Sequence, residues 1–191
     1  NIQTLIEMRP ASKPILLAWK AAAATYRAVR AHEANRDDEF RQKYQEALDL
    51  FAQARQAGPK DEGVSAVTGG VYVLFGDRLP EEYRAAAWSQ AYDAFQYLWK
   101  QQGAVVDKLP IHIKGELLGG LAASAMRTGR AEEAMRYLDK ILETLPGTPY
   151  EPVAKKWKEN PKAADSASIT CLTCHEPGRL AARINALNNS K

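Results

Sequence analysis

The chain has 191 residues, of which 46% are hydrophobic and 26% are charged, a balance typical of a globular protein. Its net charge of +3 is too small for a nucleic-acid-binding surface, and the basic excess lies in residues 151–191. Such an excess could favour an acidic protein partner. The longest apolar runs, such as Val71–Phe75, are far shorter than a membrane span, so the sequence predicts no transmembrane segment.

Apolar residues at intervals of three and four predict helices along most of the chain, and proline or glycine marks their ends. Val71–Val73 would also suit a strand, but the helices on both sides favour a helix there. Four prolines between 146 and 161 predict a connector with one short helix near 153–158. A last short helix is expected from Pro177. The main predicted helices cover 14–34, 38–57, 64–75, 80–101, 111–128 and 131–145.

These helices are expected in pairs joined by tight turns, a pattern typical of an α-solenoid. The third pair resembles a tetratricopeptide repeat in its spacing of small and apolar residues. The period of about 48 residues is longer than the ~34 of that family. The expected fold is all-α, with stacked helical pairs in 1–146, a Pro-rich connector in 147–170 and a segment 171–191 packed on the pairs. The matching residues are Leu118, Leu121, Ala122, Ala125, Gly129, Ala134, Leu138, Ile141 and Pro146.

The two cysteines of the chain, Cys171 and Cys174, are three positions apart, and His175 follows directly. This CLTCH run resembles the haem-attachment motif of c-type cytochromes. In that family two thiols at this spacing add to the two vinyl groups of the porphyrin, and the adjacent histidine is the proximal iron ligand. The resemblance therefore implies one covalent haem c on Cys171 and Cys174, with His175 bound to the iron.

A redox dithiol, a structural disulfide and half of a zinc site are the alternatives for the same residues. A thioredoxin-like motif needs a βαβ context, which the helical pattern does not provide. A zinc site needs four ligands, and here two of three scattered histidines would have to join both cysteines. The chance of this spacing arising at random is on the order of 10⁻³, which favours haem.

In the cytochrome c family haem attachment takes place outside the cytoplasm, so the resemblance implies a periplasmic or otherwise exported protein. The first ten residues lack the pattern of a leader, and the printed chain is expected to be a mature or trimmed form. The layout also resembles cytochromes c′, four-helix bundles in which a basic residue follows the histidine by four positions, as Arg179 does. Pro177–Gly178 interrupts the continuous helix of such a bundle, which leaves it as the alternative fold.

The predicted helix 111–128 has one face that could receive the haem. Gly119 and Ala123 on this face would leave a shallow surface in a tetratricopeptide groove, where a flat porphyrin could lie. Small residues there could equally serve close helix packing. The candidates for the second axial ligand are, in order, His112, His32 and Met126.

Arg179 and Arg183 are expected to pair with the haem propionates, since buried carboxylates need cationic partners. One haem motif without a second catalytic constellation predicts an electron carrier rather than an enzyme. The expected function is that of a monohaem c-type cytochrome passing single electrons between protein partners. The alternatives are a five-coordinate haem that senses a gas or reduces peroxide, and a haem-bearing scaffold subunit of a larger complex.

Overall fold

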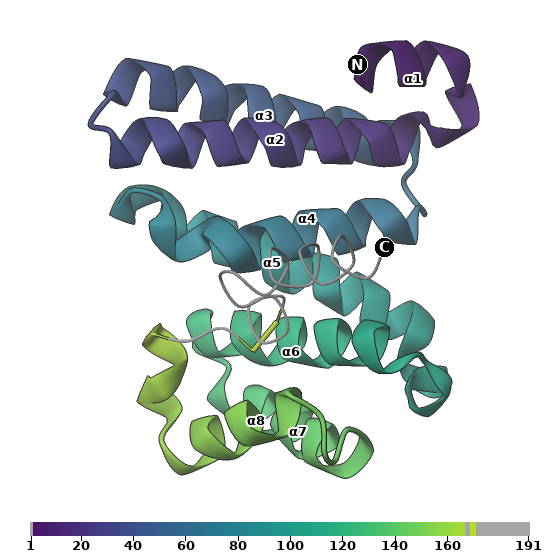
Figure 1. Cartoon of the computed structure of the whole chain (residues 1–191), viewed down its shortest axis with the longest axis vertical. Coiled ribbons are helices and arrows are strands. Elements are labelled where there is room, and N and C mark those ends of the chain that lie inside the picture. Colours follow the sequence, from purple (N-terminus) through teal and green to yellow (C-terminus); the bar gives the residue numbers. More distant parts are fainter. Residues whose placement is uncertain (1, 167–168, 171–191) are drawn as a thin grey trace, which may run out of the picture.

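The computed structural model describes residues 2–166 and 169–170, which form helices joined by short turns and no strand (Figure 1). The all-α prediction is confirmed. The α-helices are α1 (Ile2–Met8), α2 (Lys13–Glu33), α3 (Asp37–Ala57), α4 (Glu62–Phe75), α5 (Glu81–Gln102), α6 (Ile111–Arg127), α7 (Ala131–Thr144) and α8 (Tyr150–Glu159). The 3-10 helices are η1 (Pro10–Ser12), η2 (Gly76–Arg78), η3 (Gly103–Lys108) and η4 (Pro161–Ser166).

The six main helices predicted from the sequence correspond to α2–α7, and each end agrees within two residues. Local chemistry explains several of these ends. Asp61 caps α4, because its carboxylate accepts a hydrogen bond of 3.2 Å from the Val64 N–H. Gly129 follows α6 with a φ of 76°, a left-handed conformation that favours glycine. Val71–Val73 lie inside α4, so the helical interpretation of this β-branched stretch is confirmed.

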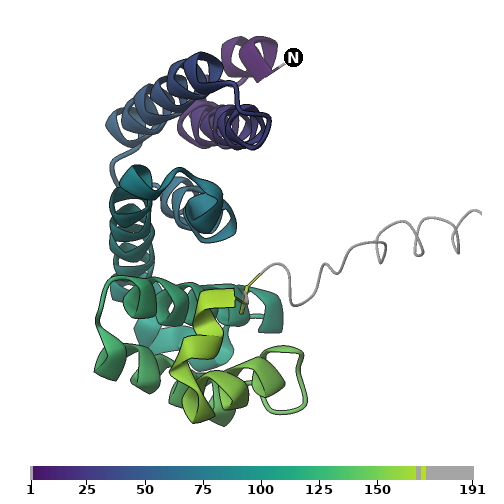
Figure 2. The same cartoon turned by 90° about the vertical axis from the view of Figure 1, so that its left-hand side faces the viewer.

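The helices pack as three pairs, α2 on α3, α4 on α5 and α6 on α7, which follow one another along the long axis (Figures 1 and 2). The first two pairs meet mainly through α2 and α4. Ile15 Cδ1 lies 3.0 Å from the position that a Cβ atom would take on Gly63, and the rings of Tyr26 and Phe75 are 6.0 Å apart. Since residue numbers differ by 48 and 49 at these two contacts, α2 and α4 run parallel in a constant register.

The second and third pairs meet around one ring, that of Phe95 in α5. Its nearest atoms lie 2.8 Å from the position of a Cβ on Gly69 of α4 and 2.2 Å from that on Gly120 of α6. Any side chain at either glycine would overlap the ring, so the two glycines allow the helices to close on it. Asp77, just after α4, pairs with Arg127 in the last turn of α6, so α4 and α6 also run parallel.

The chain after α7 forms more structure than the sequence predicted. The short helix expected near 153–158 extends over the whole of α8, because Pro152 falls in its first turn, where a helix tolerates proline. Tyr150 and Trp157 are each only 1% exposed. The Tyr150 ring lies directly on Gly115 of α6, and its hydroxyl is 3.1 Å from a carboxylate oxygen of Glu116. Helix α1 was not predicted either.

Within the described part of the chain, none of the helices has both the length and the apolar character required to cross a bilayer. The longest ones, α2, α3 and α5, carry charged residues throughout. This agrees with the sequence prediction of no transmembrane segment.

Gly115→Ala is expected to lower the free energy of unfolding, because the new methyl would lie where the Tyr150 ring packs, 2.2–2.6 Å away. Overpacking of this kind typically costs about 1–3 kcal/mol. Gly70→Ala in α4 is the matched control, since no described atom lies within 4 Å of its new methyl. Its higher helix propensity should raise the free energy of unfolding by up to about 1 kcal/mol. Urea denaturation measures both, and a stabilising Gly115→Ala would contradict the packing of α8.

Candidate functional site

The described chain reaches Thr170, one position before Cys171 of the predicted haem motif. Ile169 and Thr170 are 0% and 4% exposed. The Ile169 carbonyl oxygen lies 3.0 Å, and the Thr170 Cγ2 atom 3.3 Å, from the position that a Cβ would take on Gly119. The chain therefore delivers its C-terminal segment to the middle of α6.

Arg127 anchors the same segment at the end of α6. Its guanidinium pairs with Asp165 of η4 at 2.7 Å and with Asp77 of η2 at 2.5 Å. It also lies 5.3 Å from the centre of the Trp88 ring, within cation–π range. The Arg127 side chain is only 14% exposed, so solvent screens these interactions less than it would a surface pair. Arg127 thus joins η4 to the end of α4.

The surface that the sequence analysis left for a porphyrin above Gly119 is filled by the chain itself. Ile169 and Thr170 lie on Gly119, and Ala123 is buried with 5% of its surface exposed. The small residues of α6 therefore serve close packing in the described structure.

The outward face of α4 is open and apolar. This helix has no charged residue between Glu62 and Asp77. Gly63, Ala66, Gly70 and Leu74 recur at intervals of three, four and four and so share one side of the helix, and none of them is fully buried. No described atom lies within 4 Å of the position that a Cβ would take on Gly70. The middle of this face is therefore bare backbone.

Two aromatic residues of α2 continue this apolar surface. The side chains of Trp19 and Tyr26 are 55% and 50% exposed. The register between α2 and α4 places Ala22, between them, beside Gly70. We name the surface formed by these residues the α2–α4 face. Its members are Trp19, Ala22, Tyr26, Ala66, Gly70 and Leu74.

The α2–α4 face and Thr170 lie on the same side of the molecule. Gly69 of α4 and Gly120 of α6 both face the Phe95 ring, with α4 above α6 in Figure 1. Gly70 comes one residue after Gly69 in α4, and Gly119 comes one residue before Gly120 in α6. Because the two helices run parallel, the turn of about 100° per residue directs both positions to the same side. The chain that covers Gly119 thus ends beside the open face of α4.

The candidate axial ligands in the described residues do not converge. The parallel helices α2, α4 and α6 form one layer. His112 is exposed in the first turn of α6, whereas His32 lies in the last turn of α2, at the opposite end of this layer, with its ring 5.7 Å from that of Phe40. Met126 is half-buried against the core. No cluster of three or more metal-binding side chains occurs among residues 2–166 and 169–170. Cys171, Cys174, His175, Arg179 and Arg183 lie outside the described residues.

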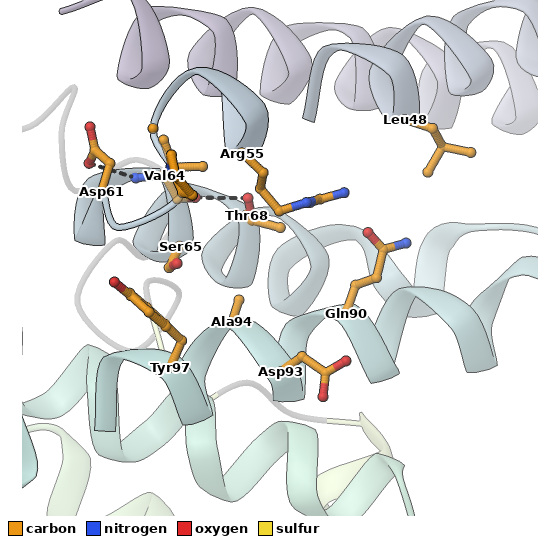
Figure 3. Close-up of a pocket in the computed structure, with 12 residues that line it drawn as sticks. Leu48, Arg55, Asp61, Val64, Ser65, Thr68, Gln90, Asp93, Ala94 and Tyr97 are labelled. Atoms are coloured by element: carbon orange, nitrogen blue, oxygen red, sulfur yellow. Dashed lines mark hydrogen bonds between the residues drawn. The ribbon is translucent and has the colours of Figure 1, made fainter. Parts of the chain in front are cut away.

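A cavity of about 680 Å³ lies between α3, α4 and α5, on the side of α4 opposite to Gly70 (Figure 3). Two of its polar groups serve the start of α4, where Asp61 caps the helix and the Thr68 hydroxyl donates to the Val64 carbonyl at 2.8 Å. Burial raises the pKa of Tyr44 of α3 to about 12 and raises that of Tyr72 of α4 further, so both hydroxyls stay neutral. The contacts of Asp61 and Thr68 give these two lining residues a structural role.

Comparison of the chain with protein-family models, with curated proteins and with solved structures finds no match. Two features of the chain bear on its function, the chemistry of the CLTCH run and the geometry around Thr170. At that point Ile169 and Thr170 form a buried tether on α6, and an open apolar face lies beside it.

Arg127→Met is expected to lower the free energy of unfolding by about 1–3 kcal/mol, because it removes two ion pairs and the contact with Trp88. Asp165→Asn breaks only the link to η4. Because the Asp165 side chain is 74% exposed, this substitution should lower the free energy of unfolding by less than about 1 kcal/mol. It should nevertheless speed hydrogen exchange in residues 161–166. Glu143→Gln, which breaks a surface pair on α7, is the control and should leave that exchange unchanged. Equal exchange in all three variants would contradict the anchoring role of Arg127.

Proposed function

We propose that the protein is a monohaem c-type cytochrome that carries single electrons between protein partners outside the cytoplasm. The observation that carries this proposal is the CLTCH run, which contains both cysteines of the chain and is followed by no further cysteine. The helical surroundings support it over a thioredoxin-like dithiol, since the described residues include no strand.

The residues that would hold the haem are Cys171, Cys174 and His175. Each thiol would add across a vinyl double bond, with the sulfur on one carbon and the thiol hydrogen on the other, so no atom would be lost. His175 would bind the iron through an imidazole nitrogen. When bound, haem c supplies a one-electron couple of the iron. The bare apolar surface around Gly70, beside the point where the described chain ends, fits a flat and largely apolar macrocycle.

We also propose that the helical pairs form a tetratricopeptide-like stack rather than a cytochrome c′-like bundle. The parallel register of α2 and α4, offset by 48 and 49 residues, supports a repeat of helix pairs. The packing is serial, since α7 contacts α6 and α8 and, through hydrogen bonds of Glu133 and Tyr137, α5, but makes no substantial contact with the first pair. A four-helix bundle would instead place its helices around one shared core. Stacked pairs also leave extended surfaces for protein partners, acidic ones or subunits of a larger complex among them.

The positions of the histidines favour a second candidate, an open iron site that senses a gas or reduces peroxide. His112 lies seven positions from Gly119, about 10 Å along α6, and His32 lies near the opposite end of the helix layer. Neither imidazole adjoins Thr170. An iron with only His175 as a protein ligand would keep one position free for a small molecule.

Covalent attachment is expected in a host with machinery for c-type maturation. After denaturation the chain should be heavier than the bare sequence by the full mass of one haem, because thioether formation loses no atoms. Cys171→Ala/Cys174→Ala should release its haem on denaturation. Intact-mass spectrometry of both proteins measures this. A parent chain at the bare mass would contradict the proposal.

Carbon monoxide binding to the reduced protein separates the carrier from the open-site alternative. A six-coordinate carrier should not bind it, and His112→Ala should then create a binding site if His112 is the second ligand. His32→Ala is the matched comparison at the other end of the helix layer. Absorption spectra record the result. Binding by the parent protein would favour the sensor or peroxide-reducing function.

A further inference from the structure

We infer that the α2–α4 face is the docking surface for residues 171–191 and the haem that they carry. This inference rests on the proposed function, which supplies the haem. It adds the surface of this chain on which the cofactor lies, a place distinct from the covered helix α6.

The chain has two Gly–Gly pairs in its helices, Gly69–Gly70 in α4 and Gly119–Gly120 in α6. Glycine inside a helix costs about 1 kcal/mol relative to alanine, so each one calls for a reason. Gly69 and Gly120 are explained by the Phe95 ring, and Gly119 by Ile169 and Thr170. Gly70 alone among the four meets no described atom within 4 Å. Gly119 is the corresponding position on α6, and Ile169 and Thr170 cover it. By analogy, we infer that a part of the chain after Thr170 covers Gly70.

The segment after Thr170 is long enough to reach the open face of α4. Thr170 lies on Gly119, and packed helices are about 8–10 Å apart, so the open face of α4 begins within that distance. An extended chain advances about 3.5 Å per residue. Three or four residues therefore suffice to bring Cys174 over Gly70. The tether needs no movement of α8 or of the Arg127 anchor.

The α2–α4 face matches a porphyrin in shape and polarity. The floor of the face consists of backbone and small side chains at Ala22, Ala66 and Gly70, so a flat ring could approach closely. Trp19 and Tyr26 border it with half-exposed aromatic rings, which offer stacking and edge contacts to a porphyrin. No charged residue of α4 interrupts it between Glu62 and Asp77. Covering this face would remove apolar surface from water, which favours docking.

The segment after Thr170 brings apolar residues of its own to this face. The spacing of Leu180, Ile184 and Leu187 predicts one apolar side in its last helix. An apolar stripe tethered beside an open apolar face gives the segment a local partner at high effective concentration.

The test places a charge on the face without disturbing the scaffold. Gly70→Glu puts a carboxylate where the described structure leaves open space, so the helix tolerates it in the absence of the segment. Docking would bury that carboxylate without a partner, which is unfavourable. Ala52→Glu on the exposed side of α3 is the control of equal charge.

Tryptic cleavage after Arg179 and Arg183 in the native, haem-bearing protein reports on docking. We expect slow cleavage in the parent and in Ala52→Glu, and at least about tenfold faster cleavage in Gly70→Glu, since proteolysis follows the undocked population. Hydrogen exchange in 62–75 should rise in Gly70→Glu alone. Equal cleavage and exchange in Gly70→Glu and Ala52→Glu would overturn the docking surface.

Nuclear magnetic resonance tests whether the haem lies on the α2–α4 face, because a paramagnetic iron shifts the resonances of nearby protons. The Trp19 indole N–H resonance should shift between the oxidised and reduced proteins, while that of Trp99, which packs on Tyr137 at 5.7 Å and away from the face, should shift less. A larger shift at Trp99 would overturn the placement. Intact mass is recorded on the same samples. A haem-bearing chain that fails these tests refutes only the docking surface, whereas a chain without haem refutes the proposed function as well.

Discussion

The close approach of three helices around the Phe95 ring is the constraint on which the geometry of the proposed site depends. Because Gly69 and Gly120 lack side chains, α4 and α6 can both pack on this ring, and their parallel register is fixed there. The register in turn directs Gly70 and Gly119 to one side of the molecule. A larger residue at either contact would rotate or separate the helices, and the tether at Thr170 would no longer end beside the open face.

Helix positions could be predicted from the sequence because the determinants are local. Asp61 caps α4 and Gly129 ends α6 through their own backbone and side-chain chemistry, which a sequence displays directly. The inward burial of Tyr150 and Trp157 could not be predicted with the same certainty. Their partners lie on α6 and α7, and aromatic residues in a Pro-rich stretch fit a surface connector as well as a packed helix.

The candidate site shows a sharper form of the same limit. Gly119 and Ala123 share a helix face in the sequence, and small residues at this spacing are equally compatible with helix packing, with a ligand surface and with coverage by another part of the chain. The structure selects the third possibility for Gly119, through Ile169 fifty positions away. Nothing in the local pattern distinguishes Gly119 from Gly70. The difference between a covered and an open glycine is tertiary, so only the fold could reveal which helix offers free surface.

Covalent attachment separates two tasks that a non-covalent haem site must combine, namely keeping the cofactor and burying it. If Cys171 and Cys174 keep the haem, the helices need to supply only one apolar wall and a fixed point from which the C-terminal segment starts. The buried residues of α8, the anchor at Arg127 and the contact of Ile169 with Gly119 supply that fixed point. A wall made of helix backbone and two aromatic rings would leave the other side of the macrocycle to the short C-terminal segment. On an open face of the stack, part of the haem edge would stay close to solvent, where a redox partner could approach it. The open side of the helical stack would then serve both to hold the haem and to present it.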